Sequence, residues 1–131
     1  MKNLIIDLDG TLTLDVDASY PDKPVNIDVV NKLKEYKILG FNITILTSRN
    51  MRTYDGNIGK MNIYTLPVII EWLNRHEVPY DEVVLGKPWC GFEGFYVDDK
   101  SIRPSEFASL NYDQIKDLLD KENLFKDGGN R

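Results

Sequence analysis

The stretch Leu4-Ile5-Ile6-Asp7-Leu8-Asp9-Gly10-Thr11 decides the fold class. Its apolar half is too short for a helix and is typical of a buried strand. The aspartates therefore lie where a strand ends and a loop begins, which is where open α/β sheets carry their chemistry. Because two such close carboxylates repel each other, we expect a shared proton or a hard cation such as Mg2+. Gly10 permits a sharp turn, and Thr11 offers a hydroxyl and a backbone amide to phosphate. The alternative is a polar turn without function.

Length and composition indicate one globular domain. The chain has 131 residues, of which 42% are hydrophobic and 28% charged. No apolar run approaches the ~20 residues that cross a bilayer, and the start does not resemble a secretory signal. We therefore expect a cytoplasmic protein with no membrane partner.

Cysteine, histidine and net charge exclude several classes of protein. The single cysteine, Cys90, cannot form an internal disulfide, and with the single histidine, His76, it cannot make the usual zinc site. We expect His76 to end a helix and complement its dipole. The formal net charge of -5 argues against nucleic acid as the main partner, because phosphate backbones select basic surfaces.

Apolar patterns alternate between strand and helix along the chain. This alternation predicts a doubly wound, parallel α/β sheet. The expected strands are 4–6, 41–46, 83–85 and 95–97. The first expected helix is 28–37, which Gly40 ends. The second is 65–76, capped by the Thr65 hydroxyl and closed by Pro79. The third is 112–121, capped by Asn111, with Ile115, Leu118 and Leu119 directed inward.

Each expected strand is followed by a reactive group. In a parallel sheet all of these strand ends face one crevice, and their joint occurrence by chance is far less probable than any one motif. The groups are Asp7 with Asp9, Thr47 with Ser48, Lys87, and Asp98 with Asp99.

Taken in order, these groups resemble the four signatures of the haloacid dehalogenase-like (HAD) superfamily of phosphohydrolases. The resemblance runs from Leu4 to about Lys100 and implies a Rossmann-like HAD core. It implies that Asp7 is the nucleophile, which forms an aspartyl phosphate, and that Asp9 is the general acid and base. The other implied roles are phosphate binding by Gly10, Thr11, Thr47, Ser48 and Lys87, and Mg2+ binding by Asp7, Asp9, Asp99 and Asp98, with direct coordination assigned to Asp99.

Segments around Thr47, Lys87 and Asp98 further resemble small bacterial phosphatases associated with capsular polysaccharide biosynthesis. The loops after Gly10 and Arg49 are too short for a cap domain, so the site is expected to be open. Only nine residues, Gly86 to Gly94, precede the last expected strand, fewer than a helical crossover needs, so we expect Lys87 on a tight, irregular turn. The candidates for substrate specificity are Arg49, Arg52, Lys60, Asn62, Trp89 and Arg103; for Trp89, core packing is favoured slightly over contact with a sugar.

The sequence thus predicts a phosphoric monoester hydrolase that uses Mg2+ on a small phosphorylated metabolite: a sugar, polyol or amino-alcohol phosphate. One catalytic domain is expected over 1–125, with a disordered tail over 126–131. A homo-oligomer is possible, with the loop from Arg52 to Asn62 near its interface. The alternative is a phospho-accepting signalling module of the receiver type, although there the lysine follows the last strand, whereas Lys87 precedes a second acidic pair.

Overall fold

The computed structural model describes residues 2–127, with side chains as far as Glu122. The chain divides into two compact units, Met1–Trp89 and Cys90–Arg131. The single domain predicted over 1–125 stays a prediction. Of the predicted tail, residues 128–131 lie outside the described residues, whereas Lys126 and Asp127 continue the last helix.

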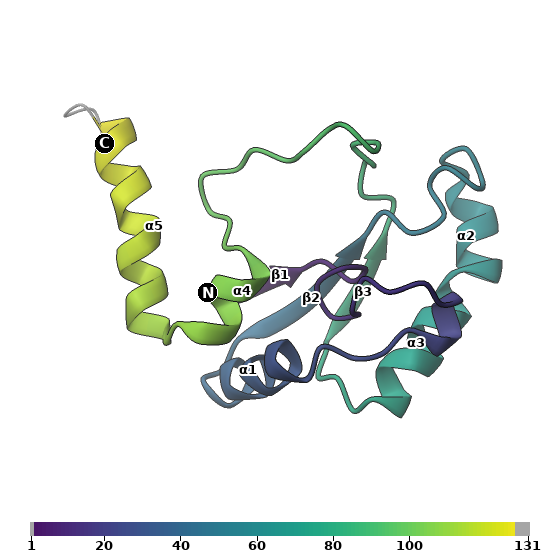
Figure 1. The fold of residues 1–131 in the computed structure, drawn as a ribbon, viewed down its shortest axis with the longest axis horizontal. Coiled ribbons are helices and arrows are strands. Elements are labelled where there is room, and N and C mark those ends of the chain that lie inside the picture. The colour runs from purple at the N-terminus through teal and green to yellow at the C-terminus, as the bar shows by residue number, and fades with distance from the viewer. Residues whose placement is uncertain (1, 128–131) are drawn as a thin grey trace. The chain divides into compact units, whose positions relative to one another are not determined.

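The first unit contains a parallel sheet of three strands, β1 (Asn3–Ile6), β2 (Asn42–Thr47) and β3 (Glu82–Leu85), in the order β1-β2-β3 (Figure 1). The register pairs Ile5 with Thr44 and Leu46 with Val84. The predicted α/β class with a parallel sheet is confirmed, because the chain returns to the start of the sheet through helices after β1 and after β2.

Three helices supply the core of this unit: α1 (Ile27–Ile38), α2 (Ile58–Tyr64) and α3 (Leu66–Arg75). The sheet contributes alternate residues from one face, such as Ile43 and Ile45, and burial there follows the strand period of two. Since β1, β2 and β3 advance in one direction, right-handed crossovers put α1 and α3 on the same face. The buried helix residues are Val29, Val30, Leu33, Tyr36, Met61, Ile69, Trp72 and Leu73.

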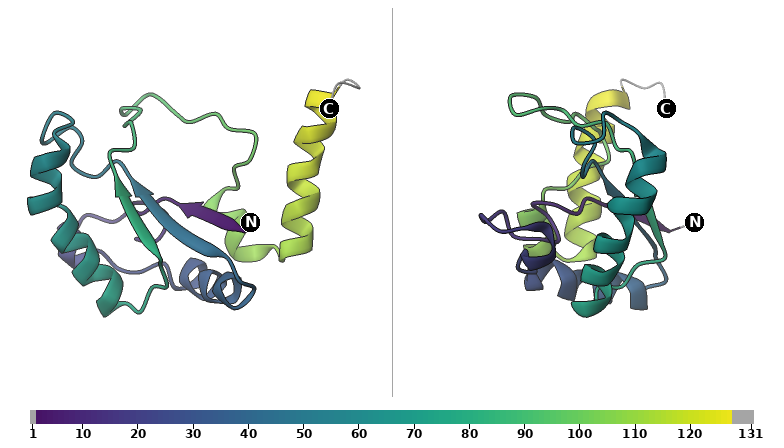
Figure 2. Two further views of the ribbon diagram at one scale, coloured as in Figure 1. Left: turned by 180° about the vertical axis from the view of Figure 1, so that it is seen from behind. Right: turned by 90° about the vertical axis from the view of Figure 1, so that its right-hand side faces the viewer.

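The opposite face of the sheet has no helix of the first unit over it. Ile5 is 65% exposed and Val84 44% exposed there. Seen from behind, the strands are not crossed by any helix of residues 2–89 (Figure 2). One helical layer is therefore present in this unit.

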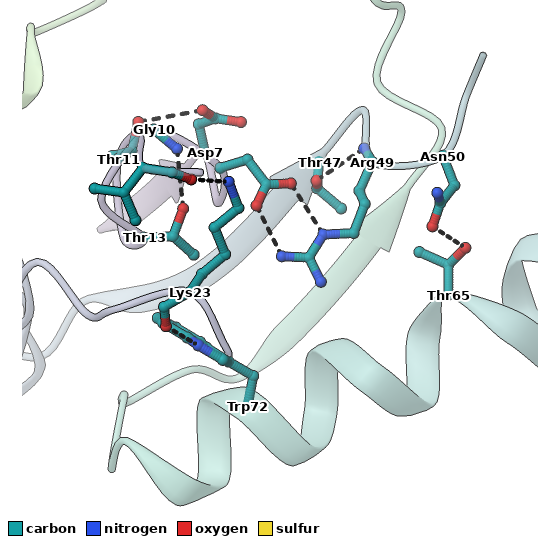
Figure 3. A network of polar contacts seen from close by, with 12 residues as sticks. Asp7, Gly10, Thr11, Thr13, Lys23, Thr47, Arg49, Asn50, Thr65 and Trp72 are labelled. Carbon is teal, nitrogen blue, oxygen red and sulfur yellow. Dashed lines mark hydrogen bonds and ion pairs between the residues drawn. The ribbon is translucent and has the colours of Figure 1, made fainter. Parts of the chain in front are cut away.

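The segment between β1 and α1 is fastened to α3. It forms a bridge between Thr13 and Val25 and a short helix, η1 (Tyr20–Asp22). The indole Nε1 of Trp72 donates to the Lys23 carbonyl at 2.8 Å (Figure 3), and Arg75 Nη2 donates to the Pro21 carbonyl at 2.6 Å. This segment consequently has a fixed course beside the ends of the strands.

The second unit contains two helices, α4 (Pro104–Ser109) and α5 (Tyr112–Asp127). The predicted cap of the last helix is confirmed, because Asn111 Oδ1 accepts from the Gln114 N–H at 2.8 Å. Ile115 is buried, as predicted. No helix in the described part of the chain is long and apolar enough to span a bilayer.

The helix predicted over 65–76 is confirmed as α3, whereas α2 before it was not predicted. Two other expectations about secondary structure are wrong. Residues 95–97 are not assigned to a strand, because a preference for strand does not by itself supply the hydrogen-bonded neighbour that a strand requires. The Thr65 hydroxyl does not cap α3, because it donates to Asn50 Oδ1 at 2.8 Å (Figure 3).

His76 ends α3 as predicted, but its expected dipole role is not supported. Burial is the main reason that the pKa of His76 lies below its ordinary value of 6.5, and the neighbouring Arg75 charge adds to this. A neutral imidazole at pH 7 brings no positive charge to the end of the helix.

Candidate active site

Asp7 follows β1 directly and is held by two different groups. The Thr11 hydroxyl donates to Asp7 Oδ2 at 3.2 Å, and Lys87 Nζ lies 3.7 Å from Asp7 Oδ1. Gly10, with φ of +81°, lets the chain turn back, and the N–H of Thr11 donates to the Leu8 carbonyl at 3.2 Å. Both groups that Thr11 was predicted to offer to phosphate are therefore engaged within this loop.

Asp9 is clamped by Arg49. Nε and Nη2 of Arg49 donate to the two carboxylate oxygens of Asp9 at 2.9 and 2.8 Å. Arg49 is only 4% exposed, and its guanidinium lies 4.1 Å from the centre of the Tyr20 ring. Figure 3 shows Arg49 reaching from the end of β2 toward the loop that carries Asp7. Arg49 thus lies buried at the site as a partner of Asp9.

The ends of β2 and β3 carry Thr47, Ser48 and Lys87, and a backbone hydrogen bond links the two strand ends. The Lys87 N–H donates to the Thr47 carbonyl at 3.1 Å, which brings the ends of β2 and β3 together. The buried Thr47 hydroxyl accepts from the Arg49 N–H at 3.1 Å (Figure 3), and the Ser48 carbonyl accepts from Met51 at 3.0 Å. The sequence correctly placed Asp7, Thr47 and Lys87 at one edge of the sheet.

The electrostatics at this edge raise two pKa values. Burial raises the pKa of Asp7 above its ordinary value, against the opposing effects of Lys87 and of hydrogen bonds from Leu8 and Thr11. Burial also raises the pKa of Tyr20, with the Asp9 charge acting in the same direction. Burial disfavours the ionised form of a carboxyl group, and any further positive charge that approaches the group favours that form again.

The first unit alone does not supply a complete set of ligands for Mg2+. Asp7 contributes a carboxylate, whereas both oxygens of Asp9 are bound to Arg49. Residues 2–127 contain no group of three or more acidic, histidine or cysteine side chains that could hold a metal. Further oxygen ligands are required before the site fits a hard cation.

The predicted specificity residues of the first unit lie on the loop after β2, on α2 and after β3. The Arg52 guanidinium lies 5.9 Å from the centre of the Trp89 ring, and Trp89 is 39% exposed. Core packing of Trp89 is therefore wrong; Trp72 is the core tryptophan, because its indole N–H finds an internal acceptor. Lys60 and Asn62 are exposed on α2.

The remaining candidates belong to the second unit. Asp98 Oδ1 accepts from the Lys100 N–H at 2.9 Å in a turn that also contains the half-buried Asp99. Arg103 precedes α4, and its N–H donates to Glu106 Oε1 at 2.9 Å. Within their own unit these residues form a turn and a helix cap.

Two residues at the site were missed by sequence reasoning. Tyr20 covers the Arg49 guanidinium, and Thr13 Oγ1 accepts from the Gly10 N–H at 3.1 Å (Figure 3). The Thr13 contact had a usable signal, because a hydroxyl residue closely following a glycine turn often accepts from it. Tyr20 had none, since its position depends on the anchoring of η1 to α3.

A crystal structure of a target protein from Vibrio cholerae is similar to this chain. The two sequences are 58% identical and superpose with a TM-score of 0.91, and the match covers 93% of this chain and 99% of the other. The chain belongs to the same family as this Vibrio cholerae protein. A chain in the structure of a Pnkp1/Rnl/Hen1 complex matches with 22% identity and a TM-score of 0.48, over 82% of this chain and 33% of that one, a likeness too weak for argument. No family model and no curated protein matches the chain.

Proposed function

We propose that the protein is a phosphoric monoester hydrolase of the HAD type that attacks a small phosphorylated metabolite with Asp7. The observation that carries this proposal is the Asp7 carboxylate at the end of β1, with the Thr11 hydroxyl and the Lys87 ammonium on opposite oxygens. A sugar, polyol or amino-alcohol phosphate for surface polysaccharide is the proposed substrate class, on the resemblance described above. The proposed fold is a capless, doubly wound HAD core.

The chemistry assigns a separate task to each side chain. Asp7 attacks phosphorus and the bond to the leaving oxygen breaks, while Asp9, protonated on one oxygen after the Arg49 hydrogen bond to that oxygen is released, gives its proton to the leaving oxygen. Asp9 then takes a proton from water, which attacks the aspartyl phosphate and releases inorganic phosphate. Lys87 offsets negative charge at Asp7, and the Arg49 clamp orients the Asp9 carboxylate toward the reacting group.

Mg2+ would supply charge neutralisation and orientation of the phosphate oxygens. We assign Asp7 as its ligand in the first unit and propose that Asp98 and Asp99 provide the missing carboxylates. This assignment agrees with the preference of Mg2+ for oxygen ligands.

A phosphate-release assay tests the proposal. We expect phosphorylated sugars, polyols and amino alcohols to be hydrolysed in the presence of Mg2+. EDTA should stop the reaction, because removal of Mg2+ takes away the positive charge that offsets the repulsion between the carboxylates and the phosphate. Restoring Mg2+ should restore activity.

Asp7→Asn is the decisive variant, and Asp15→Asn, in the exposed part of the following loop, is its matched control. Asp7→Asn should fold and lack turnover, whereas Asp15→Asn should match the wild type. More than a few percent of activity in Asp7→Asn would refute the covalent mechanism. If the wild-type protein is phosphorylated once per molecule and does not turn over, the receiver-type alternative is favoured instead.

A further inference from the structure

Tyr20 is the first residue of η1, and its ring lies against the buried guanidinium of Arg49. The centre of the ring is 4.1 Å from Arg49 Cζ. A cation is attracted to the face of an aromatic ring, and the attraction is stronger where water is excluded. Arg49 is only 4% exposed, so water is largely excluded from this contact.

The hydrogen bonds of Arg49 all lie along one edge of its guanidinium. Nε and Nη2 donate to Asp9, whereas the buried Nη1 has no hydrogen-bond partner among the residues that the structure describes. Because the group is planar, bonds along one edge leave it able to tilt about that edge. The Tyr20 ring packs against the guanidinium and therefore limits this tilt.

Tyr20 is itself held in place by the core of the first unit. Two carbonyls of its segment accept hydrogen bonds from α3, that of Lys23 from Trp72 at 2.8 Å (Figure 3) and that of Pro21 from Arg75 at 2.6 Å. Trp72 is completely buried. A line of direct contacts consequently runs from the core through η1 and Arg49 to Asp9.

We propose that Tyr20 is a positioning residue of the hydrolase, whose ring holds the Arg49 guanidinium in the plane from which it reaches both oxygens of Asp9. This role rests on the function proposed above, because Asp9 is the proton donor in that reaction. Tyr20 acts through Arg49, so its effect on the chemical step is indirect.

The contact with Tyr20 matters most when Asp9 becomes protonated. One hydrogen bond from Arg49 is then released, and the guanidinium keeps a single bond to the carboxyl group. Packed against the Tyr20 ring, the guanidinium retains its plane, so the second bond still orients Asp9 toward the leaving oxygen. Orientation of this kind lowers the barrier of a proton transfer without any change in substrate binding.

Exchange of the Arg49 Nε–H proton with water, measured by NMR, tests the contact without any assay of activity. The signal is identified by its loss in Arg49→Lys. In Tyr20→Leu the proton should exchange at least about tenfold faster than in the wild type, because the guanidinium loses its cover. Tyr20→Phe should keep slow exchange, because the contact is made by the ring. Unchanged exchange in Tyr20→Leu, or equally fast exchange in Tyr20→Phe, would overturn the proposal.

Tyr80→Leu is the matched control for Tyr20→Leu. Tyr80 precedes β3, at the end of the sheet away from Asp7, and its hydroxyl donates to Asn74 Oδ1 at 2.8 Å. This variant should match the wild type in the exchange of the Arg49 proton and in kcat. Faster exchange in Tyr80→Leu would show that any loss of a tyrosine loosens Arg49, and would overturn a specific role for Tyr20.

Steady-state kinetics then separate positioning from a merely structural role. Tyr20→Leu should lower kcat about fivefold and change KM by less than about twofold, because Asp9 acts in the chemical step. Tyr20→Phe should restore kcat to within about twofold of the wild type. Fast proton exchange with wild-type kcat in Tyr20→Leu would show that Tyr20 holds Arg49 but does not position Asp9, which overturns the proposal. If the wild type hydrolyses no phosphate, the proposed function fails, and the exchange rates still decide whether Tyr20 holds Arg49.

Discussion

Arg49 illustrates how one side chain joins the fold to the proposed chemistry. It fixes the Asp9 carboxylate with two hydrogen bonds and is itself covered by Tyr20. The side chain of Arg49 is almost completely buried, so replacing one partner of the ion pair leaves the other charge uncompensated and destabilises the fold.

Arg49→Lys should keep the positive charge and lose the two-pronged geometry, because an ammonium cannot bind both oxygens as a planar fork. We expect kcat to fall at least about tenfold with KM little changed, since Asp9 acts only in the chemical step. Arg49→Gln should also lose about 3 kcal/mol of unfolding free energy, as measured by denaturant titration.

Lys32→Gln is the control for Arg49, because the ion pair of the partly exposed Lys32 with the exposed Glu35 contributes little to stability. It should change neither stability nor kcat measurably. Equal kcat in Arg49→Lys and the wild type would show that the orientation of Asp9 does not limit the reaction.

At this scale the sequence predicted the positions of Asp7, Thr47 and Lys87, because a parallel sheet brings the ends of its strands together whatever the loops do. It did not predict the role of Arg49. The bond between Arg49 and Asp9 joins two loops and depends on how each one turns, which Gly10 and the contacts of η1 determine.

At the scale of elements, the end of β3 depends on Gly86. Its φ is +90°, and a Cβ there would meet Ile58 Cδ1 at 2.7 Å. The next residue is Lys87, so this turn sets where the ammonium points relative to Asp7.

Gly86→Ala should cost about 1–2 kcal/mol of unfolding free energy, because the left-handed region strains a residue with a Cβ. The end of the Ile58 side chain can rotate away, so we expect no larger loss. Activity should fall in addition, because the turn before Lys87 shifts.

Gly40→Ala provides the matched comparison for Gly86→Ala. Gly40 has a similar φ of +93° with nothing within 4 Å of a built Cβ, and it lies between α1 and β2. The two variants should lose similar stability in denaturant titration, while only Gly86→Ala loses activity. Equal activity in both would mean that the geometry at Gly86 does not position Lys87.

The elements were predicted well where burial repeats regularly. Val29, Val30, Leu33 and Tyr36 of α1 are buried as expected, and Ile115 of α5 is buried within the second unit. Residues 95–97 show the limit of such reasoning, because composition reports a preference for strand while pairing requires a neighbour. Likewise, Thr65 has the composition of a cap, but Asn50 offers its hydroxyl a better partner.

At the scale of the whole molecule, the pH dependence of stability should carry the signature of His76. Its pKa in the folded protein lies below the ordinary value of 6.5, so the unfolded chain binds more protons as the pH falls through that value. The stability that neutral His76 contributes is therefore present above pH 6.5 and is lost below it.

When the pH is lowered from about 7.5 to about 5.5, the thermal unfolding midpoint of the wild type should decrease, and that of His76→Gln should decrease less. Differential scanning fluorimetry at both pH values measures the difference. Parallel curves for the two proteins would show that His76 does not contribute to acid sensitivity.

The two tryptophans of the chain occupy opposite environments. Trp72 is completely buried and donates to the Lys23 carbonyl, whereas Trp89 is partly exposed beside Arg52. Their fluorescence should separate accordingly: iodide quenches Trp89 and leaves the short-wavelength emission of Trp72. The protein thus carries two built-in optical reporters, one for the core under the sheet and one for the chain just beyond Lys87.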